Sequence, residues 1–400
     1  MKTLAIAWRY LVSRPLASGL NLLLLTLGLG SITFVLLVST QLDQAFERDL
    51  AGIGVVVGAK GSPMQLILAG VFHIDVPSGN IPLAAVQELQ KDVRVAKLIP
   101  ISLGDTFRGF RIVGTTVAYA DHYAARLASG RMWTQAMQAV VGSQVAASTG
   151  LAVGNSFIGS HGLGVGGHEH GDTPYQVTGV LAACGCVLDR LVLTATESVW
   201  KVHEKATALD EEDQKIMEAE REITLALITY KSPLAAVSFP RFVNTSTEMQ
   251  AAAPAVEVTR LLRMVGVGTA VLRGFGAVLL LTAALSVFIA LWSAVRERRG
   301  DLAMLRMLGA PPAKLAGLVL CEALLLAALA VLLGMVLGHA LTGLAGSWMQ
   351  AERSLPLTGW IWLPAEWWVP ALGFGVAALA ALLPALGAYR LDVTTLLNSR

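Results

Sequence analysis

Three histidines and a carboxylate lie close together in and beside a glycine-rich segment of the chain, Gly159–Gly171. They are His161, His168, His170 and Asp172. Imidazole nitrogens and carboxylate oxygens are common ligands of zinc, and residues two apart in an extended segment point to the same face. One interpretation is therefore a zinc site or a similar metal site. The alternative is a surface loop whose histidines bind nothing tightly.

Cys184 and Cys186 are a second pair that could do chemistry. In a strand, residues two apart lie on one face at about 7 Å, which is at the edge of the distance that a disulfide spans, so a bond between them needs a turn. An oxidising compartment would permit that bond. A metal-binding pair and two buried free thiols are the alternatives.

Enzyme chemistry is not indicated by the sequence. No segment has the spacing G-x-x-x-x-G-K-[ST] of a phosphate-binding loop, and His168-Glu169-His170 is not the H-E-x-x-H pattern of a metalloprotease. Paired carboxylates or a Ser/His/Asp arrangement at catalytic spacing are also missing. We expect that the chain does not hydrolyse ATP, and its net charge of +2 does not suggest a nucleic-acid partner.

The elements that must position these residues include four stretches without Asp, Glu, Lys or Arg. A helix needs about 20 apolar residues to cross the roughly 30 Å hydrocarbon core of a bilayer, and each stretch is long enough. The overall composition, 54% hydrophobic and 14% charged, agrees with a membrane protein. The stretches are Leu16–Leu42, Gly274–Val295, Ala323–Ala351 and Trp367–Tyr389.

The chain is therefore predicted to be an α-helical membrane protein with four transmembrane helices and an α/β domain between the first and second spans. Lys and Arg mark cytoplasmic loops, and the loop between the second and third spans is rich in Arg, so both termini should be cytoplasmic. The α/β domain then lies outside, in the periplasm of a bacterium. The predicted parts are a cytoplasmic amphipathic helix (1–15), span 1 (16–42), the periplasmic domain (43–265), span 2 (266–295), a short cytoplasmic helix (296–313), span 3 (314–342), a Trp-rich periplasmic loop (343–367), span 4 (368–390) and a cytoplasmic tail (391–400).

Within the periplasmic domain, residue alternation predicts strands and helical spacing predicts helices. Strands are expected at Ile53–Val57, Val95–Ile101, Phe107–Gly114 and Tyr175–Leu181, partly helical segments at Leu83–Asp92 and Gln135–Gly150, and a strand or loop at Tyr230–Asn244.

The segment that suggests a function is Arg296–Ala310, which reads Arg-Glu-Arg-Arg-Gly-Asp-Leu-Ala-Met-Leu-Arg-Met-Leu-Gly-Ala. Leu302, Leu305 and Leu308 recur every three residues, and Gly309 suits the left-handed position just past a helix end. The pattern predicts a short amphipathic helix on the cytoplasmic side. It could lie on anionic lipid, or it could dock a cytosolic partner.

This run resembles the coupling-helix signature of FtsX/MacB-type ABC transporter permeases, a run similar to R-x-x-E-[IL]-x-x-L-R-x-L-G-A after the second span, with Asp301 in place of the usual glutamate. The resemblance covers essentially the whole chain. A further stretch, Val71–Pro82 with His73 and Asp75, resembles a subgroup with a His-rich periplasmic insertion that is linked to zinc. The other similar segments are Cys321–Leu324, Gly334–Gly338, Pro384-Ala385, Arg390–Leu397, Gly130–Met132, Val140–Ala146 and Gly150–Gly154.

The resemblance implies a dimeric permease that binds two copies of a cytosolic ABC ATPase. ATP-driven motion would reach the periplasmic domains, which act on a periplasmic or membrane-held substrate. ATP and magnesium would then belong to the partner subunit, zinc is a candidate ligand, and membrane lipid and a periplasmic protein are further candidate partners. The alternative function is a membrane-anchored periplasmic metal-binding sensor or scaffold without a motor. The predicted ATPase-docking residues are Arg296, Glu297, Arg298, Arg299, Asp301, Leu302, Leu305, Arg306, Leu308 and Gly309.

Overall fold

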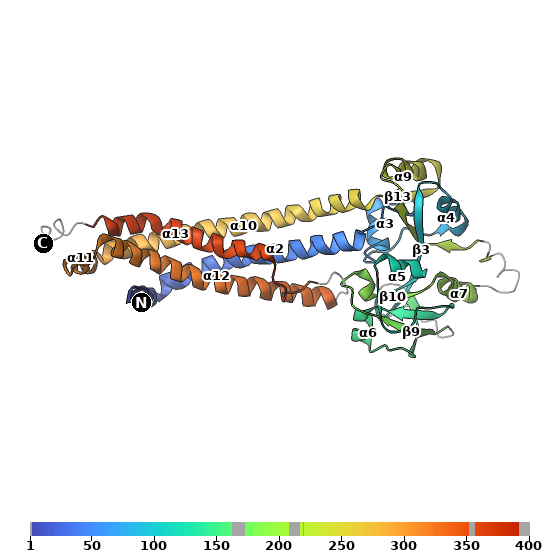
Figure 1. The fold of residues 1–400 in the computed structure, drawn as a ribbon, viewed down its shortest axis with the longest axis horizontal. Coiled ribbons are helices and arrows are strands. Elements are labelled where there is room, and N and C mark those ends of the chain that lie inside the picture. The colour runs from blue at the N-terminus through green and yellow to red at the C-terminus, as the bar shows by residue number, and fades with distance from the viewer. Residues whose placement is uncertain (1, 162–172, 208–216, 219, 352–356, 392–400) are drawn as a thin grey trace. The chain divides into compact units, whose positions relative to one another are not determined.

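The computed structural model describes residues 2–161, 173–207, 217–218, 220–351 and 357–391 (Figure 1). The chain divides into two compact units, which we call the helical unit and the external domain. The helical unit comprises Met1–Asp43 and Met264–Arg400, and the external domain comprises Gln44–Arg263.

Long apolar helices build the helical unit. Four helices in the described residues are long and apolar enough to cross a membrane, which is the number that the charge-free stretches predict. The short helix α11 lies between the second and third of them. The helices are α1 (Lys2–Ser13), α2 (Pro15–Leu50), α10 (Pro254–Glu297), α11 (Arg299–Met307), α12 (Pro312–Ala351) and α13 (Trp368–Tyr389), with a 3-10 turn, η2 (Pro364–Trp367), before α13.

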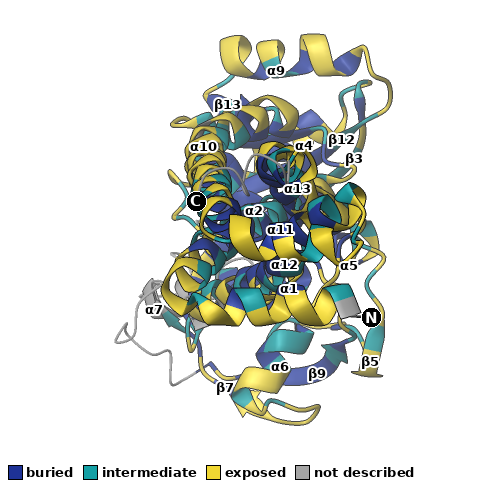
Figure 2. Ribbon diagram, turned by 90° about the vertical axis from the view of Figure 1, so that its left-hand side faces the viewer, coloured by how far each residue is buried: buried dark blue, intermediate teal, exposed yellow. Residues whose placement is uncertain are grey.

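Glycines allow the helices of this unit to pack closely, as is common between membrane helices. A Cβ placed on Gly334 of α12 would lie 3.2 Å from the backbone nitrogen of Gly30 in α2. A Cβ on Gly28 would lie 2.9 Å from the Leu280 side chain of α10. Buried Leu and Ala side chains fill the space between the helices, and the outward faces are exposed (Figure 2).

The external domain is a mixed sheet covered by short helices, and it is the predicted α/β fold. The strand order along the main path is β13-β1-β12-β3-β4-β10-β6-β9-β5, with β4–β10 and β6–β9 parallel. The strands are β1 (Val55–Ala59), β2 (Ile81–Pro82), β3 (Val95–Phe107), β4 (Phe110–Thr115), β5 (Leu127–Gly130), β6 (Gln138–Val141), β7 (Ser156–Phe157), β8 (Ser160–His161), β9 (Tyr175–Leu181), β10 (Leu191–Ala195), β11 (Glu222–Ile223), β12 (Leu225–Tyr230) and β13 (Met249–Ala252). The helices are α3 (Pro63–Gly70), α4 (Leu83–Gln90), α5 (Val117–His122), α6 (Ser143–Thr149), α7 (Thr196–Thr207) and α9 (Ala235–Ser246), with a 3-10 turn, η1 (Val187–Arg190).

The sheet carries two hydrophobic cores, one near each end of the strand order. The first lies around β1, β12 and β13 with α4 and α9, and includes Phe239 and Val243. The second lies around β4, β6, β9 and β10, where the Tyr175 ring stacks on Phe157 at 5.2 Å. Strand β9 has the predicted bounds, whereas β1, β3 and β4 are shifted or longer than predicted.

One prediction for this domain is wrong. The segment Tyr230–Asn244 was expected to be a strand or a loop because of its two prolines, but Ala235–Ser246 is helix α9 with Pro240 inside it. Ala235, Phe239 and Val243 are spaced by four residues and are all buried, and Phe239 and Val243 pack in the first core of the sheet. Burial of this stripe outweighs the loss of one helical hydrogen bond at Pro240.

Candidate functional site

Helix α11 ends in the way that its sequence predicts. Gly309 adopts a left-handed backbone with φ of 90°. The N–H of Gly309 donates to the carbonyl of Arg306 and the N–H of Ala310 donates to the carbonyl of Leu305, both at 3.0 Å. This pair of bonds is the Schellman motif, which closes a helix and turns the chain sharply. The motif fixes the end of α11 ahead of α12.

The two faces of α11 differ from the predicted docking stripe. Leu302 is only 3% exposed and packs in the hydrophobic core of the helical unit, and Leu305 is half-buried beside that core. Met304, Met307 and Leu308 are 57%, 58% and 80% exposed. We call these three residues the exposed α11 face. The sequence pattern therefore located the helix, but Leu302 holds it to the bundle, while the two methionines and Leu308 are open to a partner.

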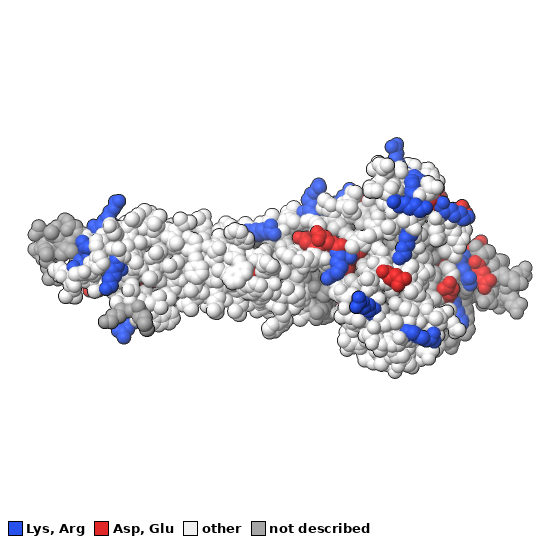
Figure 3. All heavy atoms as spheres, in the orientation of Figure 1, with Lys and Arg blue, Asp and Glu red and all other residues white. Residues whose placement is uncertain are grey.

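The charged residues around α11 also divide into two groups. Arg296, Arg299 and Asp301 are exposed, and Arg306 is half-buried. Figure 3 shows Lys and Arg gathered at the end of the helical unit that carries α11, next to a largely uncharged surface along the helices. The exposed charges could contact an oppositely charged partner.

The remaining charges bind α1 to the rest of the unit. Arg14, which lies between α1 and α2, forms an ion pair with Glu297, at the end of α10. Arg298 lies 3.6 Å from the Glu322 carboxylate of α12, and its guanidinium stacks 3.8 Å from the centre of the Tyr10 ring. We call these five residues the cytoplasmic cluster. Glu297 and Arg298, predicted as docking residues, therefore have internal partners.

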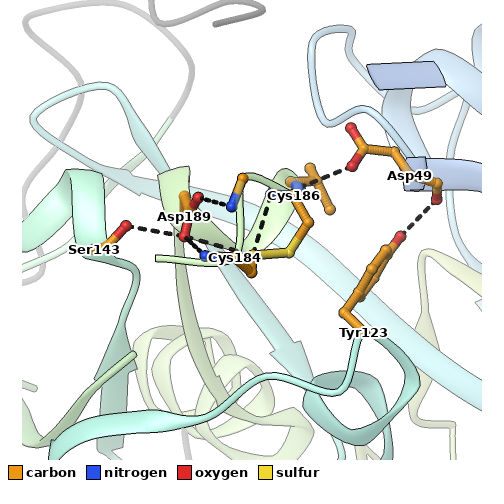
Figure 4. The surroundings of a disulfide bond; sticks show 8 residues. Asp49, Tyr123, Ser143, Cys184, Cys186 and Asp189 are labelled. Carbon is orange, nitrogen blue, oxygen red and sulfur yellow. Dashed lines mark hydrogen bonds between the residues drawn. A yellow bond between two sulfur atoms is a disulfide. The ribbon is translucent and has the colours of Figure 1, made fainter. Parts of the chain in front are cut away.

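A second group of contacts holds the end of α2 inside the external domain. The N–H of Val187 donates to the Asp49 carboxylate at 3.0 Å, and the Tyr123 hydroxyl donates to the Asp49 carbonyl at 2.8 Å (Figure 4). Phe46, one turn earlier, packs edge-on against Phe72 at 4.9 Å. We call these five residues the α2 anchor. Asp49 is 3% exposed, so these bonds are shielded from water.

The two cysteines beside this anchor form a disulfide, with their Cα atoms 5.1 Å apart. Gly185 between them has φ of +64°, which supplies the turn that the bond needs. The Asp189 carboxylate accepts the N–H groups of Cys184 and Gly185 at 3.0 and 2.7 Å, and the Ser143 hydroxyl at 2.9 Å (Figure 4). The alternative of a metal-binding pair does not hold here, because both sulfur atoms are used in the bond.

The predicted zinc residues are only partly within reach of the structure. His168, His170 and Asp172 lie outside the described residues. The backbone of His161 belongs to β8, where it pairs with Asp105 of β3. Among the described residues there is no group of three or more His, Cys, Asp or Glu side chains that could hold a metal ion. The zinc site therefore stays a prediction about the loop.

His73 is a buried core histidine, in agreement with the interpretation that it shapes a loop. Its Nε2 atom lies 2.9 Å from the Tyr119 hydroxyl, and the residue has a left-handed backbone with φ of 55°. Burial, followed by the positive charges of Arg111 and Arg190, holds the pKa of His73 well below its usual range. His73 is thus neutral in the folded domain.

Sequence reasoning missed a histidine–carboxylate pair in the helical unit. His339 of α12 contacts Glu366 of η2 at 2.8 Å, and Glu366 is fully buried. The only signal in the sequence was a histidine in an otherwise apolar span and a glutamate in the Trp-rich loop. An ionisable residue within a membrane span is expensive and is often functional.

Comparison with protein families identifies the relatives of the chain. The model of the MacB-like periplasmic core domain matches residues 18–227, just over half of the chain, and the model of the FtsX-like permease C-terminal region matches residues 273–393. The chain belongs to the FtsX/MacB family of ABC transporter permeases. It is a multi-pass protein of the inner membrane with a periplasmic domain, and it has no catalytic activity of its own. In this family, ATP hydrolysis belongs to a separate ABC ATPase subunit, and the permease is expected to be dimeric.

Solved structures give two further similarities for this FtsX/MacB-type permease. The periplasmic region of MacB from Actinobacillus actinomycetemcomitans is 13% identical, with a TM-score of 0.35, over 54% of this chain and 95% of that one. The extracellular domain of the noncanonic ABC-type transporter YknZ from Gram-positive bacteria is 12% identical, with a TM-score of 0.31, over 49% of this chain and 98% of that one. No curated protein matches the sequence.

Proposed function

We propose that this permease works as a dimer that passes the ATP-driven motion of a cytosolic ABC ATPase to its periplasmic domain. The periplasmic domain then acts on a periplasmic or membrane-held substrate. The observation that carries the proposal is the exposed α11 face, an apolar surface with arginines beside it on a helix whose opposite side is fixed in the bundle.

The exposed α11 face is apolar, so contact with a protein groove would stabilise it more than contact with water does. Met304, Met307 and Leu308 are spaced three and four residues apart, which is one stripe of a helix. Methionine side chains are flexible and adapt to an irregular groove. Arg299 and Arg296 can contact acidic groups at the rim. Because Leu302 packs in the hydrophobic core of the helical unit and the Schellman motif fixes the turn toward α12, a force on this face would move the bundle and not just the loop.

The helices that would carry this motion are longer than a bilayer requires. Helix α2 has 36 residues and α10 has 44, which correspond to roughly 54 and 66 Å at ~1.5 Å per residue, against a hydrocarbon core of about 30 Å. The last turns of α2 are held in the external domain by the α2 anchor. A displacement of α2 along or about its axis would therefore reach the sheet through hydrogen bonds and a packed aromatic pair.

The dimer contact that we propose lies on the outer side of α10. Val267, Val271, Phe275 and Val278 are exposed and recur every three or four residues. On the same helix, Gly274 has open space around its Cβ position. Apolar stripes with small residues are typical of contacts between membrane helices. A second copy of the chain would cover this stripe.

Lipid and a periplasmic protein are further proposed partners. Leu4, Trp8 and Val12 of α1 are exposed at a spacing of four residues, which fits a helix lying in the membrane interface. In the external domain, a groove of about 780 Å³ runs between α4, α9 and β13 and is lined by Phe242 and Met249 among others. This groove is our candidate for the contact with a periplasmic protein.

The docking proposal is tested by co-purification with the cognate ABC ATPase. We expect Met307→Asp with Leu308→Asp to reduce ATPase recovery at least tenfold, because a buried carboxylate opposes docking in an apolar groove. The matched control is Ala313→Asp, an exposed apolar position just after α11, which should leave recovery unchanged. Equal recovery with both variants would contradict the proposal.

Zinc is proposed as a ligand of the periplasmic loop, supported by the residue pattern of His161, His168, His170 and Asp172. Calorimetric titration of the full chain with zinc should show binding that is lost when the three histidines are replaced with alanine. A purified chain that binds zinc but never an ATPase would instead support the sensor without a motor.

A further inference from the structure

The loop after α12 is packed tightly back onto that helix. We call residues 357–367 the strap. Gly346 of α12 leaves room for the carbonyl oxygen of Leu357, which would lie 2.1 Å from a Cβ at that position. Gly359 of the strap lies over α12 in the same way, with the carbonyl oxygen of His339 2.2 Å from its Cβ position. Glycine at both positions therefore allows backbone to lie on backbone.

The strap is also bound to α2, because the Gln41 side chain forms two hydrogen bonds with the backbone of the strap, as a neighbouring strand would. The Gln41 amide donates to the carbonyl of Thr358 at 3.0 Å and accepts the N–H of Thr358 at 2.9 Å. The strap consequently links α2 to α12 at this end of the helical unit. Its release would remove both contacts from α2.

His339 of α12 lies under the strap. Its two hydrogen bonds require one proton more than a neutral imidazole and an ionised carboxylate carry together. Its Nδ1 atom lies 2.7 Å from the carbonyl oxygen of Gly359, and a carbonyl only accepts, so Nδ1 must carry a proton. Its Nε2 atom lies 2.8 Å from the Glu366 carboxyl oxygen. One of these two atoms must also carry a proton for a hydrogen bond to exist. An imidazolium with a carboxylate and a neutral imidazole with a carboxylic acid hold the same number of protons.

The other groups that the described residues place around His339 and Glu366 are neutral. The second oxygen of Glu366 accepts the N–H of Leu363 at 2.7 Å, which does not bring a charge. Within the described part of the chain, no other charged side chain forms an ion pair or hydrogen bond with His339 or Glu366. Helix α2 contributes the neutral Gln41, and Trp362 of the strap covers the imidazole ring in a stacked contact at 6.0 Å. Glu352 and Arg353 lie outside the described residues.

We propose that His339 and Glu366 form a proton-binding site that holds the strap on α12, so that docking of the strap responds to periplasmic pH. An imidazole in water is largely neutral above about pH 6.5, and a carboxyl group is ionised there. The hydrogen bonds of the docked strap therefore require one proton more than a free imidazole and a free carboxylate hold above about pH 6.5. Docking is favoured by acid and weakens as the pH rises, by up to about tenfold in the docking equilibrium per pH unit.

The site gives the permease an input that is separate from ATPase docking. The strap braces α2 against α12, and its proton comes from the periplasmic side. A fall in periplasmic pH would keep the strap bound to α2 and α12, and a rise would release α2 from the strap. The proposal does not depend on the exposed α11 face, since its test alters no residue of α11 and needs no ATPase.

The test measures release of the strap in the full-length chain in lipid nanodiscs. Leu357 of the strap is buried, whereas Trp360 of the strap is already exposed. Single cysteines at these positions, Leu357→Cys and Trp360→Cys, are placed in a Cys321→Ser background and labelled with a thiol reagent from pH 6 to pH 9. The ratio of the two labelling rates removes the pH dependence of the thiol chemistry. We expect this ratio to rise at least tenfold across the range.

The decisive variant is Glu366→Gln, which supplies the shared proton permanently. Its amide can donate to a neutral His339, while its oxygen still accepts the N–H of Leu363. We expect a low ratio at every pH, that is, a strap that no longer opens in alkali. A ratio in the unsubstituted pair that is flat with pH, or a Gln variant that opens with pH as the unsubstituted pair does or stays open throughout, overturns the proposal.

If Glu366→Gln does not yield a folded protein, amide hydrogen exchange of the strap in the unsubstituted chain decides. Exchange corrected for its intrinsic pH dependence should be at least tenfold faster at pH 8.5 than at pH 6. Equal corrected rates would overturn the proposal.

Discussion

The cytoplasmic cluster holds the chain around α1 and the start of α2, and the α2 anchor holds the end of α2. The two groups use different interactions. The cytoplasmic cluster uses ion pairs between side chains, of which Arg298–Glu322 is largely buried and Arg14–Glu297 is the more exposed, at 30% and 61%. The α2 anchor uses buried hydrogen bonds to backbone groups and an aromatic contact. Exposed ion pairs break and re-form at little free-energy cost, whereas buried hydrogen bonds do not. The comparison indicates an adjustable connection at Arg14–Glu297 and a fixed one at the α2 anchor.

The largest effect is expected from breaking the fixed connection. Asp49→Ala leaves the N–H of Val187 without its acceptor and removes the negative charge near Arg190. Loss of such a buried partner costs about 2–3 kcal/mol. Hydrogen exchange of the external domain in the full-length chain should show a corresponding loss of protection. Glu47→Ala, an exposed change half a turn away on the same helix, should have an effect within about 0.5 kcal/mol. Equal losses of protection for the two variants would show that the hydrogen bonds of Asp49 do not stabilise the external domain more than an exposed residue of α2 does.

A second effect comes from pH and again concerns only the buried region. His73 is neutral when folded because its pKa lies well below the usual value, but in an unfolded chain it takes up a proton below about pH 6.5. The contribution of His73 to the stability of the external domain should therefore be constant above pH 6.5 and should decrease below it, by up to about 1.4 kcal/mol per pH unit. His122, whose pKa is also lowered by burial, adds to the same trend. Asp49 opposes this trend, because burial raises its pKa to about 6 and the folded domain therefore takes up a proton there as the pH falls.

His73→Gln provides the control for this pH effect. Glutamine keeps a polar partner for the Tyr119 hydroxyl but does not titrate, so the slope of stability between pH 6.5 and 5 should decrease. An unchanged slope would assign the whole effect to other groups.

The sequence predicted the helical unit better than the external domain, for a physical reason. Four spans follow from length and hydropathy alone, since only a continuous apolar helix satisfies its backbone in lipid. In the external domain, α9 was missed because two prolines outweighed the spacing of Ala235, Phe239 and Val243 in the sequence interpretation. Tertiary burial decided that segment, and burial is not visible in a short sequence window.

The candidate sites show the same division. Gly309 and the position of α11 were predictable because a helix end is local. Which side of α11 faces the core was not, because it depends on how Leu302 packs in the hydrophobic core of the helical unit. The pairing of His339 with Glu366, 27 residues later, depends on the course of the strap, which no local pattern specifies. The turn at Gly185 that allows the disulfide is local, but the choice between disulfide and metal pair required the fold.

A smaller effect is expected from the disulfide beside the α2 anchor. The bond closes a loop of only three residues, so it removes little entropy from the unfolded chain, about 1.5 kcal/mol in the chain-entropy description. Replacing Cys184 and Cys186 together with alanine should thus reduce the stability of the external domain less than Asp49→Ala does. Urea unfolding of the full chain, with Cys321→Ser as the control that does not touch the bond, would measure this order. A larger loss than for Asp49→Ala would mean that the disulfide, and not Asp49, is the main support of the anchor.

The smallest effect is expected at the adjustable connection. Arg14→Gln removes an ion pair whose two side chains are 30% and 61% exposed, and such pairs contribute about 0–1 kcal/mol because water and salt screen them. The thermal midpoint of the full chain should hardly move, yet α1 should become more accessible, which limited proteolysis near Arg9 can report. Screening predicts that 1 M salt produces the same accessibility in the unsubstituted chain. If Arg14→Gln instead lowers stability as much as Asp49→Ala, the two ends of α2 are held equally firmly. The Arg14–Glu297 pair is then not an adjustable connection.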